Sequence, residues 1–381
     1  MARGIEIPIT PEVLYWAIKQ SGYDEETLAD KLDVPSDIVR EWASGVSLPL
    51  KSKFDRLTKI LKRPSALFFL PEPPEVSHSP VSFRHPADSE RESLSPKELQ
   101  YIREVRRIQQ TLGWAREQMD EPTASIGRFS QLGDPEKAAK ETRRHLNISI
   151  GDQLSWKNSS KAQASWRLAL EKIGILVFFL PMGKQSVRGF SLAHDIAPAI
   201  AVNTWWNSEA RIFGLLHEYG HLVTDSSSAC LDSPRQLRRS TGDPIERWCE
   251  RFAASVILPW DELAQYAMQR FGWPKLNAIT DLEQIYSISR KFKVSARATA
   301  IRFIDKGYAD WEIYRAIPAV KDHKKGGGAS GGRNRFEIRR DEYGASVPKL
   351  FIKAVDRDLI ERTEALSFLN ISDSDLDGWR E

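Results

Sequence analysis

The stretch from position 174 to 203 breaks the helical pattern that governs most of this chain. It contains three β-rich segments separated by turn residues, GILVFFLPM, VRGFSLA and APAIAVN. Short runs of β-branched and aromatic residues bounded by Gly and Pro are typical of strands. Helical spacing dominates before and after this stretch. We therefore expect a mostly helical α+β fold in which a small antiparallel sheet packs on helices.

The composition indicates a globular protein with more than one domain. The chain has 381 residues, of which 41% are hydrophobic and 12 are Trp, so it can build packed interiors. We expect a cytoplasmic protein with no membrane partner, because the sequence has neither a long apolar run nor a secretion signal. Two cysteines, Cys230 and Cys249, provide no disulfide framework and match no Cys-based zinc motif.

The first seventy residues are predicted to form short helices with tight breaks. The helical segments are TPEVLYWAIKQSG, DEETLADKLDV, PSDIVREWASG and SKFDRLTKILKR. In the second segment, Thr27, Leu28, Ala29 and Leu32 are expected to face inward. The second and third segments, joined by LDVPS, are typical of a helix-turn-helix.

Proline-rich and glycine-rich segments suggest where the parts of the chain begin and end. Pro71, Pro73 and Pro74 cannot continue a helix, and HKKGGGASGGRNR near the C-terminus is typical of a flexible hinge. The predicted parts are a helix-turn-helix domain at 1–70, a linker at 71–95, a main domain with a helical lead-in at 96–322, the hinge at 323–335 and a small helical unit at 336–381.

The segment FGLLHEYGHLVTD carries the strongest chemical signal. A helix turns about 100° per residue, so His217 and His221 lie on one face and can bind the same ion. Glu218 is adjacent, where a carboxylate can accept a proton from a metal-bound water. The alternative is that an ordinary helix contains two histidines by chance. A third protein ligand would favour the metal site.

The segment DPIERWCERFAASVILP offers two carboxylates for that third ligand. Glu246 follows His221 by 25 positions, which leaves room for a loop and a returning helix, and Glu250 lies one turn later on the same face. One of them could bind zinc while the other holds a ligand histidine by a hydrogen bond. The group that stabilises the oxyanion stays open, with His194, Arg211 and Tyr266 as candidates by residue type only.

These motifs resemble a known family. AIAVNTWWNSEARIFGLLHEYGHLV and IERWCERFAASVILP resemble the ImmA/IrrE metallopeptidases over about residues 165 to 305, and the N-terminal helices are similar to the Xre-type helix-turn-helix commonly fused to them. The resemblance implies that the domain at 96–322 is a zincin-like peptidase. It also implies Zn²⁺ as cofactor, His217, His221 and Glu246 as ligands, and Glu218 as the catalytic carboxylate.

One position departs from the family pattern E-x-x-[AC]-x-x-F-A. Its small residue is Cys249 here, and the following position, usually Asn or Asp in the family, is Glu250. A supporting role for Glu250 in the site is therefore less secure than the ligand role of Glu246. Family members typically cleave a transcriptional repressor or act beside a toxin gene, so the resemblance implies a regulator or toxin-system protein as substrate.

The charge of the first seventy residues leaves DNA binding open. They contain ten Lys and Arg against ten Asp and Glu, whereas DNA-binding modules usually carry a positive surplus. The candidate contacts are Ser36, Arg40, Lys51 and Lys53. Two hypotheses follow: a zinc endopeptidase with a DNA-binding or sensing front domain, or a repressor-like or antitoxin-like protein that binds DNA and a partner without cleaving it. A homodimer is expected by analogy with Xre-like modules.

Overall fold

The computed structural model describes residues 5–74, 81–84, 94–130, 133–224, 244–318 and 334–379, with the backbone alone for 81–84. The chain separates into two compact units. The N-terminal unit comprises residues 1–79, 90–104 and 230–237, and the main unit comprises 80–89, 105–229 and 238–381. Among the described helices, none combines the length and the apolar character that a membrane-spanning segment requires.

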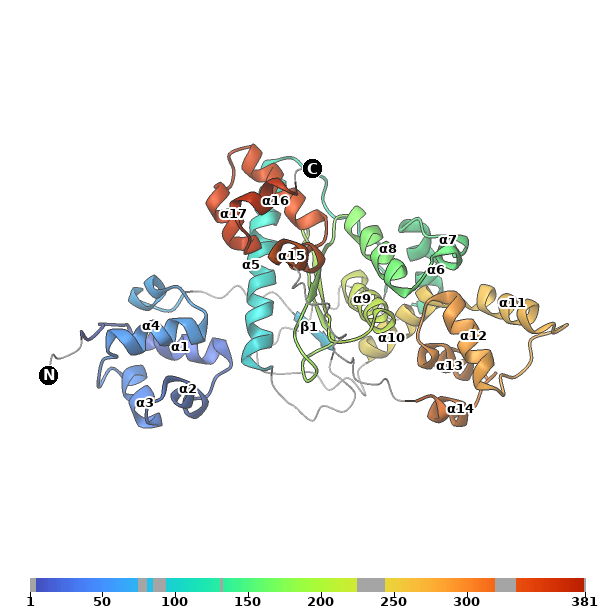
Figure 1. Ribbon diagram of the computed structural model, residues 1–381, viewed down its shortest axis with the longest axis horizontal. Helices are drawn as coiled ribbons and strands as arrows, with labels where there is room; N and C mark the ends of the chain where they lie inside the picture. The colour runs from blue at the N-terminus through green and yellow to red at the C-terminus, as the bar shows by residue number, and fades with distance from the viewer. Residues whose placement is uncertain are drawn as a thin grey trace. The chain divides into compact units, whose positions relative to one another are not determined.

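The N-terminal unit is a group of short helices around its own apolar core (Figure 1). The elements are α1 (Pro11–Ser21), α2 (Glu25–Leu32), α3 (Ser36–Ser44), α4 (Lys51–Leu61) and the 3-10 helix η1 (Ser65–Phe69). Asp24 caps α2 by accepting a hydrogen bond from the backbone of Thr27 at 2.6 Å, and Gly45 ends α3 in a left-handed conformation. The four predicted helices are confirmed, but Thr27 is exposed because it occupies the first turn beside this cap.

The main unit contains a four-stranded mixed sheet with strand order β1-β3-β4-β2. The strands are β1 (Val81–Arg84), β2 (Leu176–Leu180), β3 (Gly189–Leu192) and β4 (Ala199–Asn203). β3 pairs antiparallel with both β1 and β4, whereas β2 pairs in parallel with β4. The α+β class is confirmed, but the expected antiparallel sheet is wrong. β4 lies between β3 and β2 and pairs in parallel with β2, so the sheet is mixed. The segment predicted as a linker contributes β1.

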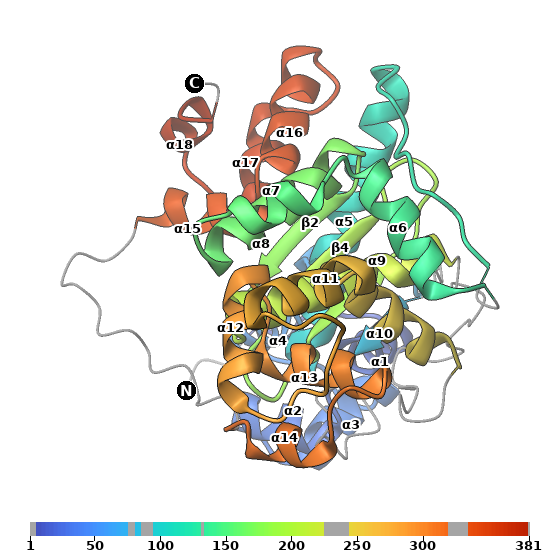
Figure 2. The ribbon, with the colours of Figure 1, turned by 90° about the vertical axis from the view of Figure 1, so that its right-hand side faces the viewer.

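Both faces of β2 are covered, which explains its unbroken apolar sequence. Val177 and Phe179 belong to the large core that β2 shares with α8 (Ser159–Lys172), α9 (Ser208–Val223) and α10 (Pro244–Ile257). Phe178, pointing the other way, makes an edge contact with Tyr343 at 5.9 Å between ring centroids. In Figure 2, β2 and β4 lie side by side next to α8 and α9.

Further helices surround this core. They are α5 (Pro96–Gln118), whose residues up to Glu104 belong to the N-terminal unit, and, in the main unit, α6 (Pro135–His145), α7 (Ile150–Ser155), α11 (Trp260–Phe271), α12 (Leu282–Phe292), α13 (Ala296–Asp305) and α14 (Trp311–Ala316). Helices α11 to α14 form a group that follows α10 (Figure 1, Figure 2).

The C-terminal helices belong to the main unit instead of standing apart. They are α15 (Arg335–Tyr343), α16 (Ser346–Asp356), α17 (Arg362–Leu369) and α18 (Asp373–Asp377), and both α15 and α16 pack against β2. The buried guanidinium of Arg167 on α8 links them to the sheet. It donates to the carbonyl of Val177 at 2.6 Å and to the carbonyls of Asp341 and Glu342 at 2.6 and 3.0 Å. Most of the predicted hinge at 323–335, namely residues 323–333, lies outside the described residues.

Candidate metal centre

Helix α9 carries both motif histidines into the interior. The side chain of Asn207 caps its start by accepting from the backbone of Ala210 at 2.9 Å, as the sequence pattern requires. His217 and His221, one turn apart, retain only 0% and 5% of their exposed surface. Their Nε2 atoms lie 3.3 Å apart. The two imidazoles therefore direct the same nitrogen toward one point.

Two small residues let α10 approach α9 closely. A Cβ atom at Gly220 of α9 would stand only 3.2 Å from Cβ and Sγ of Cys249 on α10. Cys249 is buried and is itself smaller than the large apolar residues around it. Because Glu246 lies almost one turn before Cys249, this contact sets Glu246 opposite the histidines.

Glu246 completes a buried cluster with the two histidines. Its Oε2 lies 3.2 Å from Nε2 of His217, and its Oε1 lies 3.1 Å from Nε2 of His221. One ligand atom from each of the three residues can be chosen so that all lie within 4.8 Å of one another. The sequence-based expectation that a carboxylate from the second helix meets the paired imidazoles is therefore observed.

The electrostatics of the cluster reflect burial opposed by close partners. Burial alone would raise the pKa of Glu246, but hydrogen bonds from His217 and His221 outweigh it and hold that pKa well below its ordinary value. Burial would lower the pKa of His221, but Cys249, Glu246 and Glu218 together raise it well above the ordinary value. The carboxylate thus favours a positive charge at the point where the three side chains meet.

The donor set and its spacing fit a divalent cation. A tetrahedral zinc ion with bonds of about 2.0 to 2.2 Å to nitrogen and oxygen has neighbouring ligand atoms about 3.3 to 3.6 Å apart. The separations of 3.1, 3.2 and 3.3 Å in the cluster approach that spacing. His217, His221 and Glu246 could therefore hold such an ion with small adjustments of their side chains.

Glu218 lies beside the cluster and packs against the sheet. Its side chain is completely buried. A Cβ atom at Gly189, the first residue of β3, would stand 3.3 Å from Oε1 of Glu218 and 2.8 Å from the carbonyl oxygen of Ala201. A side chain at this position would clash with the Ala201 carbonyl and crowd the Glu218 side chain. We did not single out Gly189 from the sequence, although a glycine inside a strand often marks such a close approach.

The other candidates of the main unit have different surroundings. Glu250 is exposed on α10, so its role in supporting a ligand stays a prediction. Nδ1 of His194 accepts hydrogen bonds from the backbone of Ile196 and Ala197, both at 3.1 Å. Arg211 donates to the carbonyls of Trp206 and Thr204, and Tyr266 packs on Phe292. The side chains of all three oxyanion candidates are thus held by contacts with neighbouring segments of the fold.

The DNA-binding candidates lie on α3 and α4 of the N-terminal unit. Arg40 is exposed and pairs with Glu25 at 3.1 Å and with Asp37 at 2.8 Å. Lys51 is exposed and pairs with Asp55 at 2.7 Å. Lys53 donates to the carbonyl of Leu32 at the end of α2, and Ser36 begins α3. Three of these four side chains are thus already engaged with neighbouring groups.

Comparison with known proteins agrees with the motif. Residues 170–303 match the family model Peptidase_M78, described as the IrrE N-terminal-like domain, whereas no curated protein matches the chain. The matched segment runs from the end of α8 into α13, so it contains the whole cluster and Glu218. The resemblance of the N-terminal helices to Xre-type modules stays a prediction. For residues 170–303, the expected similarity to the IrrE-like domains of the metallopeptidase type is confirmed.

Proposed function

We propose that this chain is a zinc-dependent endopeptidase that cleaves a protein partner, such as a transcriptional regulator or a component of a toxin system. The observation that carries the proposal is the buried meeting of His217, His221 and Glu246 directly beside Glu218. Two imidazoles and a carboxylate form the ligand set of one class of catalytic zinc site. The match of residues 170–303 to a metallopeptidase family supports the same reaction class.

The chemistry divides between the ion and Glu218. Zinc held by these three side chains supplies a water of lowered pKa and polarises the carbonyl of the scissile bond. Glu218 accepts a proton from the attacking water and delivers it to the amide nitrogen as the carbon–nitrogen bond breaks. Because Glu218 is fully buried against β3, bulk water does not screen its charge.

The sheet restricts how an extended substrate can bind. The segment AIAVN forms β4, which lies between β3 and β2 and therefore cannot pair with an extended substrate. The outer strands are β1 and β2, and β2 is packed against α15 and α16. We propose that an extended peptide adds to the outer edge of β1 through backbone hydrogen bonds, because β1 pairs with β3, whose first residue Gly189 packs against Glu218.

The experiment compares the wild type with Glu218→Gln at equal zinc content. Each protein is incubated with the proteins encoded by neighbouring genes and with a mixture of unstructured peptides, and products are identified by mass spectrometry. Loss of a general base typically slows a reaction by about 10²- to 10⁴-fold, so Glu218→Gln should abolish most cleavage. Glu312→Gln, which changes an exposed carboxylate of α14, should cleave like the wild type.

The main competing function is a repressor-like protein that binds DNA and a partner without cleaving it. That function gains support if the wild type and Glu218→Gln leave every candidate intact while both still shift the promoter DNA of their own gene. We propose that the N-terminal unit binds such DNA through α3 and α4, with Ser36, Arg40, Lys51 and Lys53 as contacts. Arg40 would then exchange its carboxylate partners for phosphate or a base edge.

A further inference from the structure

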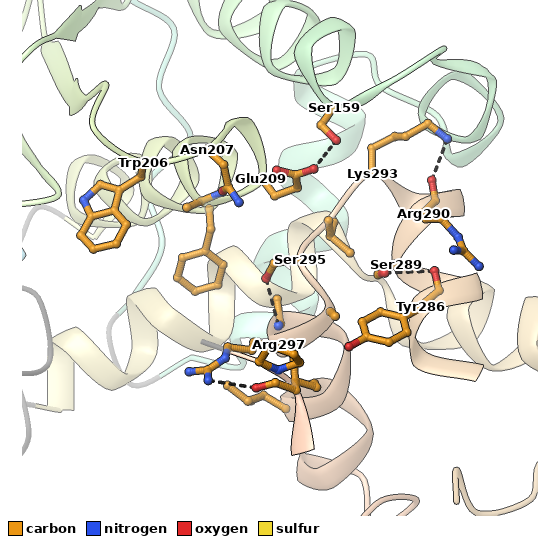
Figure 3. A pocket seen from close by; sticks show the side chains of 18 of the residues that line it. Ser159, Trp206, Asn207, Glu209, Tyr286, Ser289, Arg290, Lys293, Ser295 and Arg297 are labelled. Carbon is orange, nitrogen blue, oxygen red and sulfur yellow. Dashed lines mark hydrogen bonds between the residues drawn. The ribbon is translucent and has the colours of Figure 1, made fainter. Parts of the chain in front are cut away.

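We propose that a basic cavity at the N-terminal end of α9 binds an acidic segment of the substrate next to the scissile bond. The cavity has a volume of about 910 Å³ and is enclosed by residues near the starts of α8, α9 and α13 and the end of α12 (Figure 3). None of the candidate zinc ligands lines it. The inference rests on the proposed peptidase function and extends it to substrate selection.

The charge of the cavity wall is strongly one-sided. Its cationic side chains come from several elements and are Lys157, Arg188, Arg290, Lys293 and Arg297. Glu209 is the one carboxylate in the wall, and its oxygen accepts a hydrogen bond from the hydroxyl of Ser159. Glu283, 3.8 Å from Arg290, lies outside the wall. A cavity with this lining attracts anionic ligands and repels cationic ones.

Three helix starts add to this positive potential and outnumber the one helix end in the wall, that of α12, which opposes it. The capping residues Asn158, Asn207 and Ser295 of α8, α9 and α13 all line the cavity. Their side chains already accept hydrogen bonds from the backbones of their own helices, so the helix starts contribute mainly through their dipoles. The charged side chains remain the groups that contact a ligand.

The cavity is close to the candidate metal centre along two paths. Phe213, which lines it, precedes His217 by one turn of α9, a rise of about 6 Å. Arg188, also in the wall, directly precedes Gly189, the residue that packs against Glu218. A peptide chain with its scissile bond at Glu218 therefore reaches the cavity within a few residues.

The arrangement of the cations favours a peptide over a compact anion such as phosphate. Figure 3 shows Arg290 and Lys293 on one side of the cavity and Arg297 on another, so these three cations do not converge on one point. Arg297 is also held by the carbonyl of Ile317 at 3.1 Å. Aromatic side chains also line the cavity, including Trp206 and Tyr286. Spaced carboxylates with apolar side chains between them match this wall.

The test measures peptide binding by the full chain carrying Glu218→Gln and loaded with zinc. The probes are two fluorescein-labelled decapeptides, one of alternating Glu and Leu and one of alternating Gln and Leu, followed by fluorescence anisotropy. We expect the Glu peptide to bind about tenfold more tightly at low ionic strength, with the advantage shrinking as salt is added. Equal affinity for the two peptides would overturn the proposal.

Matched charge reversals locate the binding. Lys157→Glu combined with Arg290→Glu changes two exposed cavity residues and should remove the preference for the Glu peptide. Lys172→Glu combined with Lys275→Glu makes the same change of net charge at exposed positions outside the cavity and should preserve it. An equal loss in both double variants would show unspecific attraction. Tighter binding of inorganic tripolyphosphate than of the Glu peptide would assign the cavity to phosphate instead.

Cleavage by the zinc-loaded wild type separates the two proposals. If the Glu peptide binds in the cavity but a broad peptide mixture is never cut, the peptidase function fails and the cavity assignment stands. If peptides are cut without enrichment of Asp or Glu near the cleavage site, and the cavity double variant cuts the same set, the peptidase function stands and the acidic preference is refuted.

Discussion

The candidate metal centre and the surface of the N-terminal unit use charged residues in opposite ways. His217, His221 and Glu246 are at most 6% exposed and meet at one point. The side chains of Arg40 and Lys51 are 59% and 60% exposed and pair with nearby carboxylates. Burying ionisable groups is unfavourable unless a partner compensates, whereas exposed pairs form at almost no cost. Ionisable groups that meet in the interior are therefore stronger evidence of function than exposed ion pairs are.

Replacing Glu246 should have the largest effect. Glu246→Gln keeps the shape of the side chain but removes the negative charge that faces both histidines. Since the loss of even an outer partner of a zinc ligand lowers metal affinity by about 10- to 100-fold, we expect a loss of at least about 100-fold here. Competition with a chromophoric chelator measures the zinc affinity. Unchanged affinity would remove Glu246 from the metal site and weaken the contrast.

Glu250 offers the matched comparison on the same helix. It carries the same carboxylate one turn away but is exposed. A decrease of tenfold or more in the zinc affinity of Glu250→Gln would support its predicted role in holding a ligand histidine. An affinity equal to that of the wild type would refute that role and show that only the buried carboxylate, Glu246, contributes to zinc binding.

Arg167 is also a buried charged residue, but its contacts stabilise the fold instead of forming a metal site. It pairs with Glu171 at 3.0 Å and donates to carbonyls of β2 and α15. Arg167→Ala leaves Glu171 buried without this cation, which typically costs about 3 to 5 kcal/mol of unfolding free energy. Urea denaturation followed by tryptophan fluorescence measures the loss. Lys172→Ala, an exposed change on the same helix, should stay within about 0.5 kcal/mol of the wild type.

The Arg167 contacts also show where sequence reasoning ends. The shared helix face of His217 and His221, with Glu218 beside them, follows from helical periodicity and could be predicted. The choice of Glu246 over Glu250 as third ligand came from the family resemblance. The packing of α15 on β2 depends on Arg167 reaching Asp341 and Glu342, far away in sequence, and no local pattern encodes it. Gly344 has a φ of 68° and a Cβ there would meet the Glu171 carboxylate, but this becomes apparent only in the folded chain.

The sheet was predictable only as strands, not as an arrangement. The apolar segments that form β2 and β4 have strand composition, but composition does not determine whether two strands run parallel. β1 was missed because residues 71–95 are rich in Pro, Ser and charge, which outweighed the short segment VSFR. Strand pairing supplies the stability that the local sequence lacks, so the sequence alone favoured a linker.

Glu136 gives a smaller effect that depends on pH. Its carboxylate lies 2.6 Å from Lys306 and 3.2 Å from Arg302, linking α6 to α13. Partial burial would raise the pKa of Glu136, but the two cations outweigh it and lower the pKa below its ordinary 4.5. A lowered folded-state pKa contributes stability above pH 4.5, and that stability is lost as the pH falls through the folded-state value.

We therefore expect Glu136→Gln to lower the free energy of unfolding by about 1 kcal/mol at pH 7, because the pair is partly exposed and screened. The difference from the wild type should shrink as the pH falls below 4.5. Denaturant unfolding at pH 7, 5 and 3.5 measures it. A difference that grows toward low pH would show that the carboxylate is destabilised by its burial instead of stabilised by Arg302 and Lys306.

The smallest effect on stability is expected for Arg40. Exposed ion pairs contribute about 0 to 1 kcal/mol, so Arg40→Ala should leave the unfolding of the N-terminal unit almost unchanged. For the same reason Arg40 can leave Glu25 and Asp37 at little cost. If Arg40 contacts DNA, Arg40→Ala should lower the affinity for DNA about fivefold or more. Mobility shifts with promoter DNA test this, with Lys19→Ala on α1 as control.

If Arg40→Ala binds DNA like the wild type, the exposed pairs of this unit only keep its surface solvated. If it loses DNA affinity without losing stability, exposed charge also carries function, and burial is one sign of a site among others.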